Sequence, residues 1–172
     1  MPIVNLDPAN PLQDGRQSLR ALEIRSGVVR EFQKMGVALI SELTLANNRR
    51  ADLIGIDRKG QVLIVEIKSS IEDFRVDKKW PEYQQFCDRF YFATLIDVPA
   101  DIFPQSEGLI IADNYGCEII REAETMKLAG ATRKALTMRF ARASAQRLER
   151  VLDYCERSGT DIPTDLSHLS GD

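Results

Sequence analysis

The hydrophobic and polar positions of the chain follow a helical period first and then strand-like runs. Between residues 17 and 35 apolar residues recur at helical spacing, and Gly36 is a plausible stop. Three apolar runs follow at residues 37–45, 51–56 and 61–68, and the turn sequence DRKG separates the last two. Because both faces of these two runs are apolar, they predict central strands of a sheet.

The second half of the chain continues this pattern after a polar interruption. Residues 71–80 predict an irregular segment, and Pro81 fits the first turn of a helix that runs to about residue 89. Three more strands and a long helix without glycine or proline are expected at residues 90–96, 109–113, 117–123 and 132–156. The order of elements predicts an α/β fold in which a mixed central β-sheet is flanked by helices.

One folded domain is expected between two irregular ends. A length of 172 residues suits a single core, and the 44% hydrophobic and 28% charged residues are typical of a globular protein. Residues 1–15 contain three prolines and no period, which predicts an irregular N-terminal arm. Residues 159–172 predict a loose C-terminal tail, which leaves residues 16–158 for the domain.

Charge and rare residues restrict the chemistry. The net charge of −3 provides no overall basic field, so any contact with nucleic acid requires a local patch. Three scattered cysteines and one histidine, His168, argue against a disulfide framework, a zinc site or a histidine-based triad. We find neither a signal peptide nor an apolar run long enough for a membrane helix, and we expect a cytoplasmic protein.

Charged residues interrupt the two apolar runs around the DRKG turn. Asp52 lies in the first run and Glu66 in the second, where charge is costly to bury. A three-residue loop ending at Gly60 would place that glycine in the left-handed conformation and pair Asp57 with Gln61. Counting back sets Asp52 opposite Glu66, with their Cβ atoms about 4.5–5.5 Å apart. A two-residue loop would instead shift the pairing by one residue and separate the carboxylates.

Two interpretations account for two facing carboxylates, which repel each other. Their oxygens suit Mg²⁺ or Mn²⁺, so the pair could hold a divalent ion. Alternatively, Asp52 and Glu66 form an ion-pair network with Arg50 and Lys68, since the four charges balance. The same register sets Arg50 opposite Lys68, which is unfavourable unless twist or an anion separates the two cations.

The arrangement of Asp52, thirteen further residues and then Glu66-Ile67-Lys68 resembles the motif of the PD-(D/E)XK nuclease superfamily, with Ala51 in place of its proline. This resemblance implies a restriction-endonuclease-like core. It also implies that Asp52 and Glu66 ligate a metal ion together with the Ile67 carbonyl. Lys68 would orient the attacking water or offset charge on the phosphate.

A longer resemblance covers roughly residues 16–148. The stretches ELTLANNRRADLIGID, VEIKSSIEDFRVDKKWPEYQQFCDRFYFA, GLIIAD and LAGATRKALTMRFARASAQRL are similar to the MmcB family of bacterial DNA repair proteins. The resemblances imply a metal-dependent DNA nuclease in repair, or alternatively a catalytically silent DNA-binding or scaffolding protein of the same fold. An upstream acid is common in the superfamily, and Glu42 is favoured for it over Glu31.

Basic and aromatic residues near the motif and on the last helix are candidate contacts for DNA. Cations can hold backbone phosphates, and an aromatic ring can stack on a base. The alternative is that these residues form a solvated surface and an ordinary packed helix. The oligomeric state stays open, with a homodimer among the alternatives. The candidate DNA contacts are Arg49, Arg50, Arg75, Lys78, Lys79, Tyr83, Gln84, Arg139 and Arg142.

Overall fold

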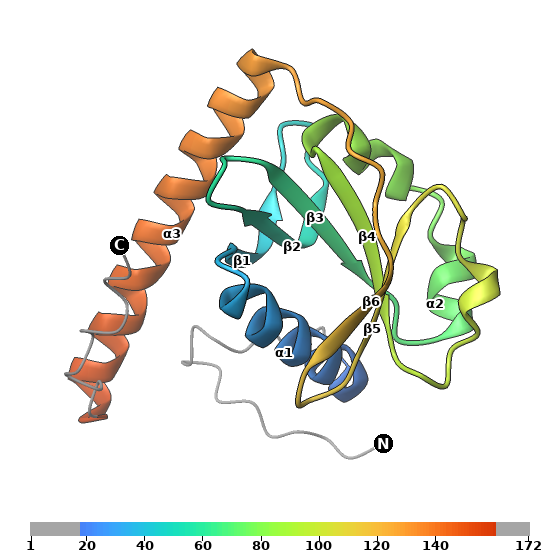
Figure 1. Cartoon of the computed structure of the whole chain (residues 1–172). Coiled ribbons are helices and arrows are strands. Elements are labelled where there is room, and N and C mark those ends of the chain that lie inside the picture. Colours follow the sequence, from blue (N-terminus) through green and yellow to red (C-terminus); the bar gives the residue numbers. More distant parts are fainter. Residues whose placement is uncertain (1–17, 161–172) are drawn as a thin grey trace. The chain divides into compact units, whose positions relative to one another are not determined.

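The computed structural model describes residues 18–160. The chain divides into two units, of which Gln17–Phe140 contains the whole sheet, and the described part of the other is residues 141–160. Figure 1 shows the long helix α3 (Gly130–Ser158). Its residues 130–140 belong to the sheet unit, and residues 141–158 belong to the other unit. The predicted arm, and the predicted tail from residue 161 onward, lie outside the described residues. Within residues 18–160 no helix is both long and apolar enough to span a bilayer.

Six strands form one mixed sheet, in which their spatial order is their order in the sequence. The central pairs β3–β4 and β4–β5 are parallel, and the outer pairs are antiparallel. The predicted α/β fold with a mixed sheet is therefore confirmed. The strands are β1 (Ala38–Thr44), β2 (Arg50–Ile56), β3 (Val62–Ile67), β4 (Arg89–Thr94), β5 (Gly108–Ala112) and β6 (Cys117–Arg121).

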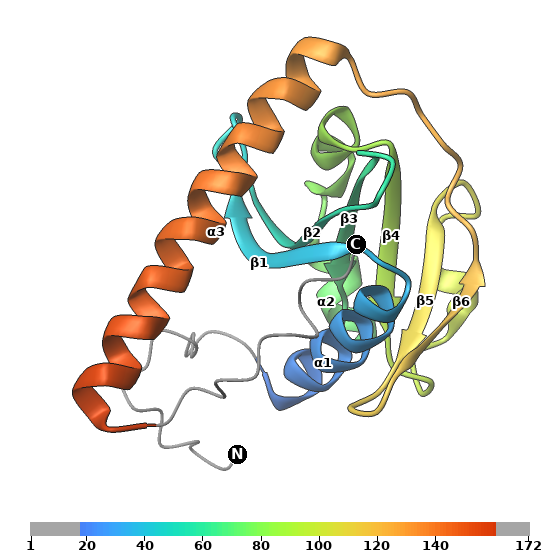
Figure 2. The ribbon, with the colours of Figure 1, turned by 60° about the vertical axis from the view of Figure 1, so that its left-hand side comes forward.

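Helix α1 (Leu19–Lys34) covers one face of the sheet (Figure 2). Ser18 caps its first turn by accepting a hydrogen bond from a backbone N–H, and Gly36, with φ of +78°, follows its end. Ile24, Val28 and Phe32 recur every four residues and are buried against the sheet. The helical period in the sequence therefore predicted the helix.

Short helices and an aromatic cluster cover the opposite face. Residues 71–80 were predicted to be irregular, but Ile71–Val76 form helix α2 because Ser70 caps the N–H of Asp73. The helix predicted after Pro81 is a 3₁₀ helix, η1 (Trp80–Phe86), which ends earlier than expected. A second 3₁₀ turn, η2, spans Ala100–Ile102. Rings from these segments and from β4 pack together: Phe74, Trp80, Tyr83, Phe90, Phe92 and Phe103.

Candidate functional site

The β2–β3 hairpin has the register that its turn predicted. Gly60 has φ of +75°, and the N–H of Asp57 donates to the Gln61 carbonyl at 3.0 Å. The pairs continue as far as Leu53 with Val65, so the next residues along, Asp52 and Glu66, are opposite each other. The three-residue loop therefore sets the two carboxylates against one another, on the sheet face that the aromatic cluster covers.

Each carboxylate of the pair also accepts a hydrogen bond from a backbone N–H of the neighbouring strand. The N–H of Asp52 donates to Glu66 Oε1 at 3.2 Å, and the N–H of Ile67 donates to Asp52 Oδ2 at 2.8 Å. One oxygen of each side chain is thus tied to the backbone of the neighbouring strand. Such bonds hold the two carboxylates in place and keep a second oxygen of each for another ligand.

Burial dominates the electrostatics of the pair. It raises the pKa of Asp52 to about 6, against which the N–H of Ile67 and the charge of Lys68 act. The pKa of Glu66 lies well above its ordinary value, first because of burial and then because of the charge on Asp52. The pair therefore retains protons that isolated carboxyl groups would lose, and a cation that replaced those protons would relieve the repulsion.

Lys68 follows β3 directly and is only 5% exposed. Its Nζ lies 2.6 Å from Asp77 Oδ2 and 3.9 Å from Glu66 Oε2. Burial lowers the pKa of Lys68, but the hydrogen bond to Asp77 and the neighbouring carboxylates raise it by more. The hydroxyl of Thr94 donates to the Lys68 carbonyl at 2.6 Å and fixes its backbone. The ammonium is thus held, charged, at the edge of the carboxylate pair.

Asp77 is the residue of this site that the sequence did not single out. It lies just after α2, in the segment that was expected to be irregular, and its contact with Lys68 is a tertiary one. Arg50 in turn forms an ion pair with Glu42. The expected repulsion between Arg50 and Lys68 is therefore relieved because each cation has a different acidic partner.

The structure separates the two candidates for an upstream acid. Glu42 lies on β1 between residues that pair with Leu53 and Ala51, so it is opposite Asp52, and its charge helps to raise the pKa of Asp52. It has φ of 56°, a strained conformation for a residue other than glycine, and β1 bends sharply (Figure 2). Glu31 instead lies on α1 beside Gly116. Of the two, only Glu42 is next to the carboxylate pair.

The predicted DNA contacts fall into engaged and exposed groups. Arg49 donates two hydrogen bonds to Glu82, at 2.8 and 2.9 Å, and Gln84 donates to Glu107 at 2.8 Å. Tyr83 is buried, and its hydroxyl donates to the Arg50 carbonyl at 3.0 Å. Side chains of this first group bind other parts of the protein. By contrast, Arg75, Lys78 and Lys79 are exposed around the end of α2.

Two further predicted contacts lie on α3. Arg139 belongs to the sheet unit and donates to the Thr44 carbonyl at the end of β1, at 3.2 Å. Arg142 is exposed and belongs to the other unit. A role in DNA binding stays a prediction for both arginines.

The donor set at the pair consists of oxygens, which suits a hard divalent ion. Across residues 18–160 no three His, Cys, Asp or Glu side chains are grouped closely enough to enclose a metal ion by themselves. A metal held by Asp52 and Glu66 would therefore need a backbone carbonyl, water or substrate oxygens to complete its shell. This open arrangement is usual for Mg²⁺, which keeps several waters and is bound by one or two carboxylates.

Comparison with known proteins places this fold in a family. The solved structure of SPO1766, a protein of unknown function from Silicibacter pomeroyi, is 34% identical in sequence and has a TM-score of 0.75. That match covers 87% of this chain and 99% of the other. No curated protein matches the chain. The family described as DNA repair protein MmcB-like matches residues 8–155, which include every strand of the sheet. The chain therefore belongs to the MmcB-like family of DNA repair proteins.

Proposed function

We propose that this chain is a nuclease of the PD-(D/E)XK type that hydrolyses DNA phosphodiester bonds with Mg²⁺ or Mn²⁺ during repair. One observation carries the proposal: the half-buried Asp52 and the buried Glu66 oppose each other beside the ammonium of Lys68. A fold stabilised by ordinary packing has no need of this costly arrangement. The family membership supplies the setting of DNA repair.

The proposed roles follow from the contacts of each group. Asp52 and Glu66 would ligate the ion through the oxygens that the backbone N–H groups do not engage, with the Ile67 carbonyl as a further ligand. A divalent ion bound there would activate water and polarise the phosphate. Lys68 would stabilise the charge that develops on the phosphate. Glu42 is the acid that would extend the site along β1.

Asp77 is assigned as a positioning residue for Lys68. The buried ammonium carries its charge because Asp77 accepts a hydrogen bond from it at 2.6 Å. Asp77 in turn accepts a hydrogen bond from the N–H of Lys79 at 2.8 Å, which fixes the carboxylate at the end of α2. Lys68 would therefore reach the phosphate from a fixed direction.

A second candidate function is a nuclease-fold protein that binds DNA or a repair partner without cutting. The contact between Lys68 and Asp77 favours it, because an ammonium held at 2.6 Å by a carboxylate must give up part of that contact to reach a phosphate. This candidate predicts binding to DNA or a partner that does not depend on a metal ion.

Cleavage assays distinguish the two functions. Labelled single-stranded, duplex, flapped and branched DNA would be incubated with Mg²⁺, Mn²⁺ or EDTA and with wild type, Lys68→Ala or Lys59→Ala. Lys59 is a matched control because it is an exposed lysine at the opposite end of the same hairpin.

The nuclease proposal predicts metal-dependent cutting by wild type and Lys59→Ala and a loss of at least about a hundredfold in Lys68→Ala. Equal cutting by Lys68→Ala would refute the assigned mechanism. DNA binding without cutting on any substrate or metal would favour the second candidate.

A further inference from the structure

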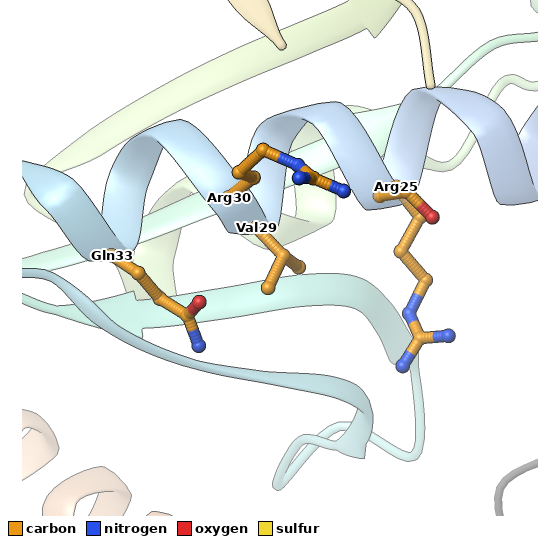
Figure 3. A pocket seen from close by; sticks show the side chains of 5 residues that line it. Arg25, Val29, Arg30 and Gln33 are labelled. Atoms are coloured by element: carbon orange, nitrogen blue, oxygen red, sulfur yellow. The ribbon is translucent and has the colours of Figure 1, made fainter. Parts of the chain in front are cut away.

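Helix α1 carries a pocket beside the stripe of residues that packs into the core. The pocket has a volume of about 450 Å³ and is lined by Arg25, Ser26, Val29, Arg30 and Gln33. These positions repeat at helical spacing beside the buried stripe of α1, so they form one continuous strip about 12 Å long. Figure 3 shows Arg25, Val29 and Gln33 on one side of the helix, with Arg30 extending along it.

The polar side chains of this pocket all offer hydrogen-bond donors, and none of its lining residues is acidic. Two are guanidinium groups, which bind phosphate oxygens with two parallel hydrogen bonds. The acidic residues of α1 interact with other cations. Glu31 accepts a hydrogen bond from Lys34 at 2.6 Å, and the charge of Glu23 contributes to raising the pKa of Arg20. The pocket therefore suits an anion.

Arg25 shows where such an anion would sit. Its Nη2 donates to the Ser41 hydroxyl on β1 at 2.9 Å. Its Nε is buried and, within the described part of the chain, has no acceptor in reach. A buried donor without a partner costs about 1–3 kcal/mol. An oxygen of a bound anion would remove that cost.

The pocket reaches the edge strand β1 on the α1 face of the sheet, and the candidate active site lies next to the same strand on the opposite face. Ser41, the partner of Arg25, immediately precedes Glu42, which is opposite Asp52. Two more arginines bind residues of β1: Arg50 forms an ion pair with Glu42, and Arg139 donates a hydrogen bond to the Thr44 carbonyl. A row of guanidinium groups along one edge fits an extended polyanion better than a small molecule.

We propose that the α1 pocket binds a backbone phosphate of DNA where the strand passes the β1 edge toward Asp52 and Glu66. This inference rests on the proposed function, since it takes DNA as the ligand. The guanidinium groups of Arg25 and Arg30 would both bind this phosphate. The contact is with the backbone, so it is independent of sequence.

The test is fluorescence anisotropy with labelled duplex and single-stranded DNA in EDTA, over a range of salt concentrations. The variants are Arg25→Gln/Arg30→Gln and Arg30→Gln alone, which keeps the contact between Arg25 and Ser41. Lys34→Gln is the matched control because it removes one positive charge from the same helix outside the pocket. Thermal melting checks that each variant is folded.

The proposal predicts that the double variant raises the Kd for DNA at least about tenfold, because charge-assisted hydrogen bonds to a phosphate are lost. The slope of log K against log salt for duplex DNA would fall in magnitude by about 0.9, the value for one phosphate. Arg30→Gln would have a smaller effect in the same direction, and Lys34→Gln would change neither quantity.

Equal binding by the double variant and Lys34→Gln would overturn the proposal. The proposal would also fail if tripolyphosphate raised the melting temperature of wild type but not of the double variant, while both proteins bound DNA equally. The pocket would then bind a free phosphate compound. Neither result affects the cleavage test of Lys68. A wild type that bound no DNA in EDTA would also overturn this inference, and the cleavage assays would still decide the proposed function.

Discussion

Replacing Asp52 by Asn should stabilise the metal-free protein at neutral and alkaline pH. The amide oxygen of Asn can still accept the hydrogen bond that the N–H of Ile67 donates to Asp52. The substitution removes only the negative charge, which burial and the charges of Glu42 and Asp73 make costly. Stability and function would then oppose each other at this residue.

The pKa of Asp52 gives the size of the effect. Burial raises it from 3.8 to about 6 in the folded protein. Each pKa unit corresponds to about 1.4 kcal/mol, so ionised Asp52 destabilises the fold by up to about 3 kcal/mol. Because the folded pKa is the higher one, the contribution of this group is favourable below pH 3.8. It is lost as the pH rises through about 6.

Urea unfolding in EDTA at pH 4 and pH 8 measures this difference. Asp52→Asn should be up to about 3 kcal/mol more stable than wild type at pH 8, or about 6–12 °C in Tm, and nearly equal at pH 4. Asp57→Asn, an acid of the turn in the same hairpin, should give no such gain. Saturating Mn²⁺ should narrow the gap, since it stabilises only wild type.

A lower stability of Asp52→Asn at pH 8 would refute this reasoning. It would mean that Asp52 takes part in a stabilising ion-pair network, which is the alternative that the balanced charges of the hairpin left open. Full cleavage activity in the same variant would add that the carboxylate has no role in catalysis.

Three more predictions concern residues of the sheet unit, and each is tested by urea unfolding. Asp77→Ala should cost about 3 kcal/mol because it leaves the buried ammonium of Lys68 without its nearest partner, and Lys68→Met in that background should recover most of the loss. Burial raises the pKa of Asp88, but hydrogen bonds from Arg133 and two backbone N–H groups lower it to about 2. Wild type should therefore lose stability as the pH falls from about 4 to 2, and Asp88→Asn should lack that loss. Gly27→Ala should cost about 1–3 kcal/mol, because the new Cβ would lie 2.1 Å from a carbonyl oxygen of the β5–β6 turn.

The hairpin could be predicted from the sequence because two local rules determine it. Side chains alternate along a strand, and a three-residue loop ending in Gly60 allows one register. The opposition of Asp52 and Glu66 follows from these rules without any knowledge of the rest of the fold. The pattern of apolar residues likewise predicted the strands and the two long helices.

The segment after the hairpin was harder to predict because its helix is short and polar. Helix α2 has six residues and no fully buried side chain, so it lacks a hydrophobic period. Its local signal is Ser70 three residues before Asp73, a capping arrangement that is too short to indicate a helix by itself. The partnership of Asp77 with Lys68 depends on how α2 docks on the sheet, which no local rule provides.

The surface of α1 shows a similar limit. Spacing predicted the helix and included Phe32, but it did not single out Ile24 and Val28, which the structure buries beside Phe32. The adjacent strip with Arg25 and Arg30 has the same period, but polar residues on a helix most often face solvent. The contact with Ser41 on β1 and the buried Nε distinguish Arg25 from an ordinary surface arginine.

Titration of Mn²⁺ by calorimetry tests the central claim most directly, because the claim is that Asp52 and Glu66 hold a divalent ion. Wild type should bind Mn²⁺ at this site at pH 8 and more weakly at pH 5. The pKa of Asp52 is about 6, so at pH 5 protons compete with the metal ion for its carboxylate. Binding should disappear in Asp52→Asn and Glu66→Gln and persist in Asp57→Asn. Equal binding in all four proteins, or none in wild type with DNA present, would contradict the account.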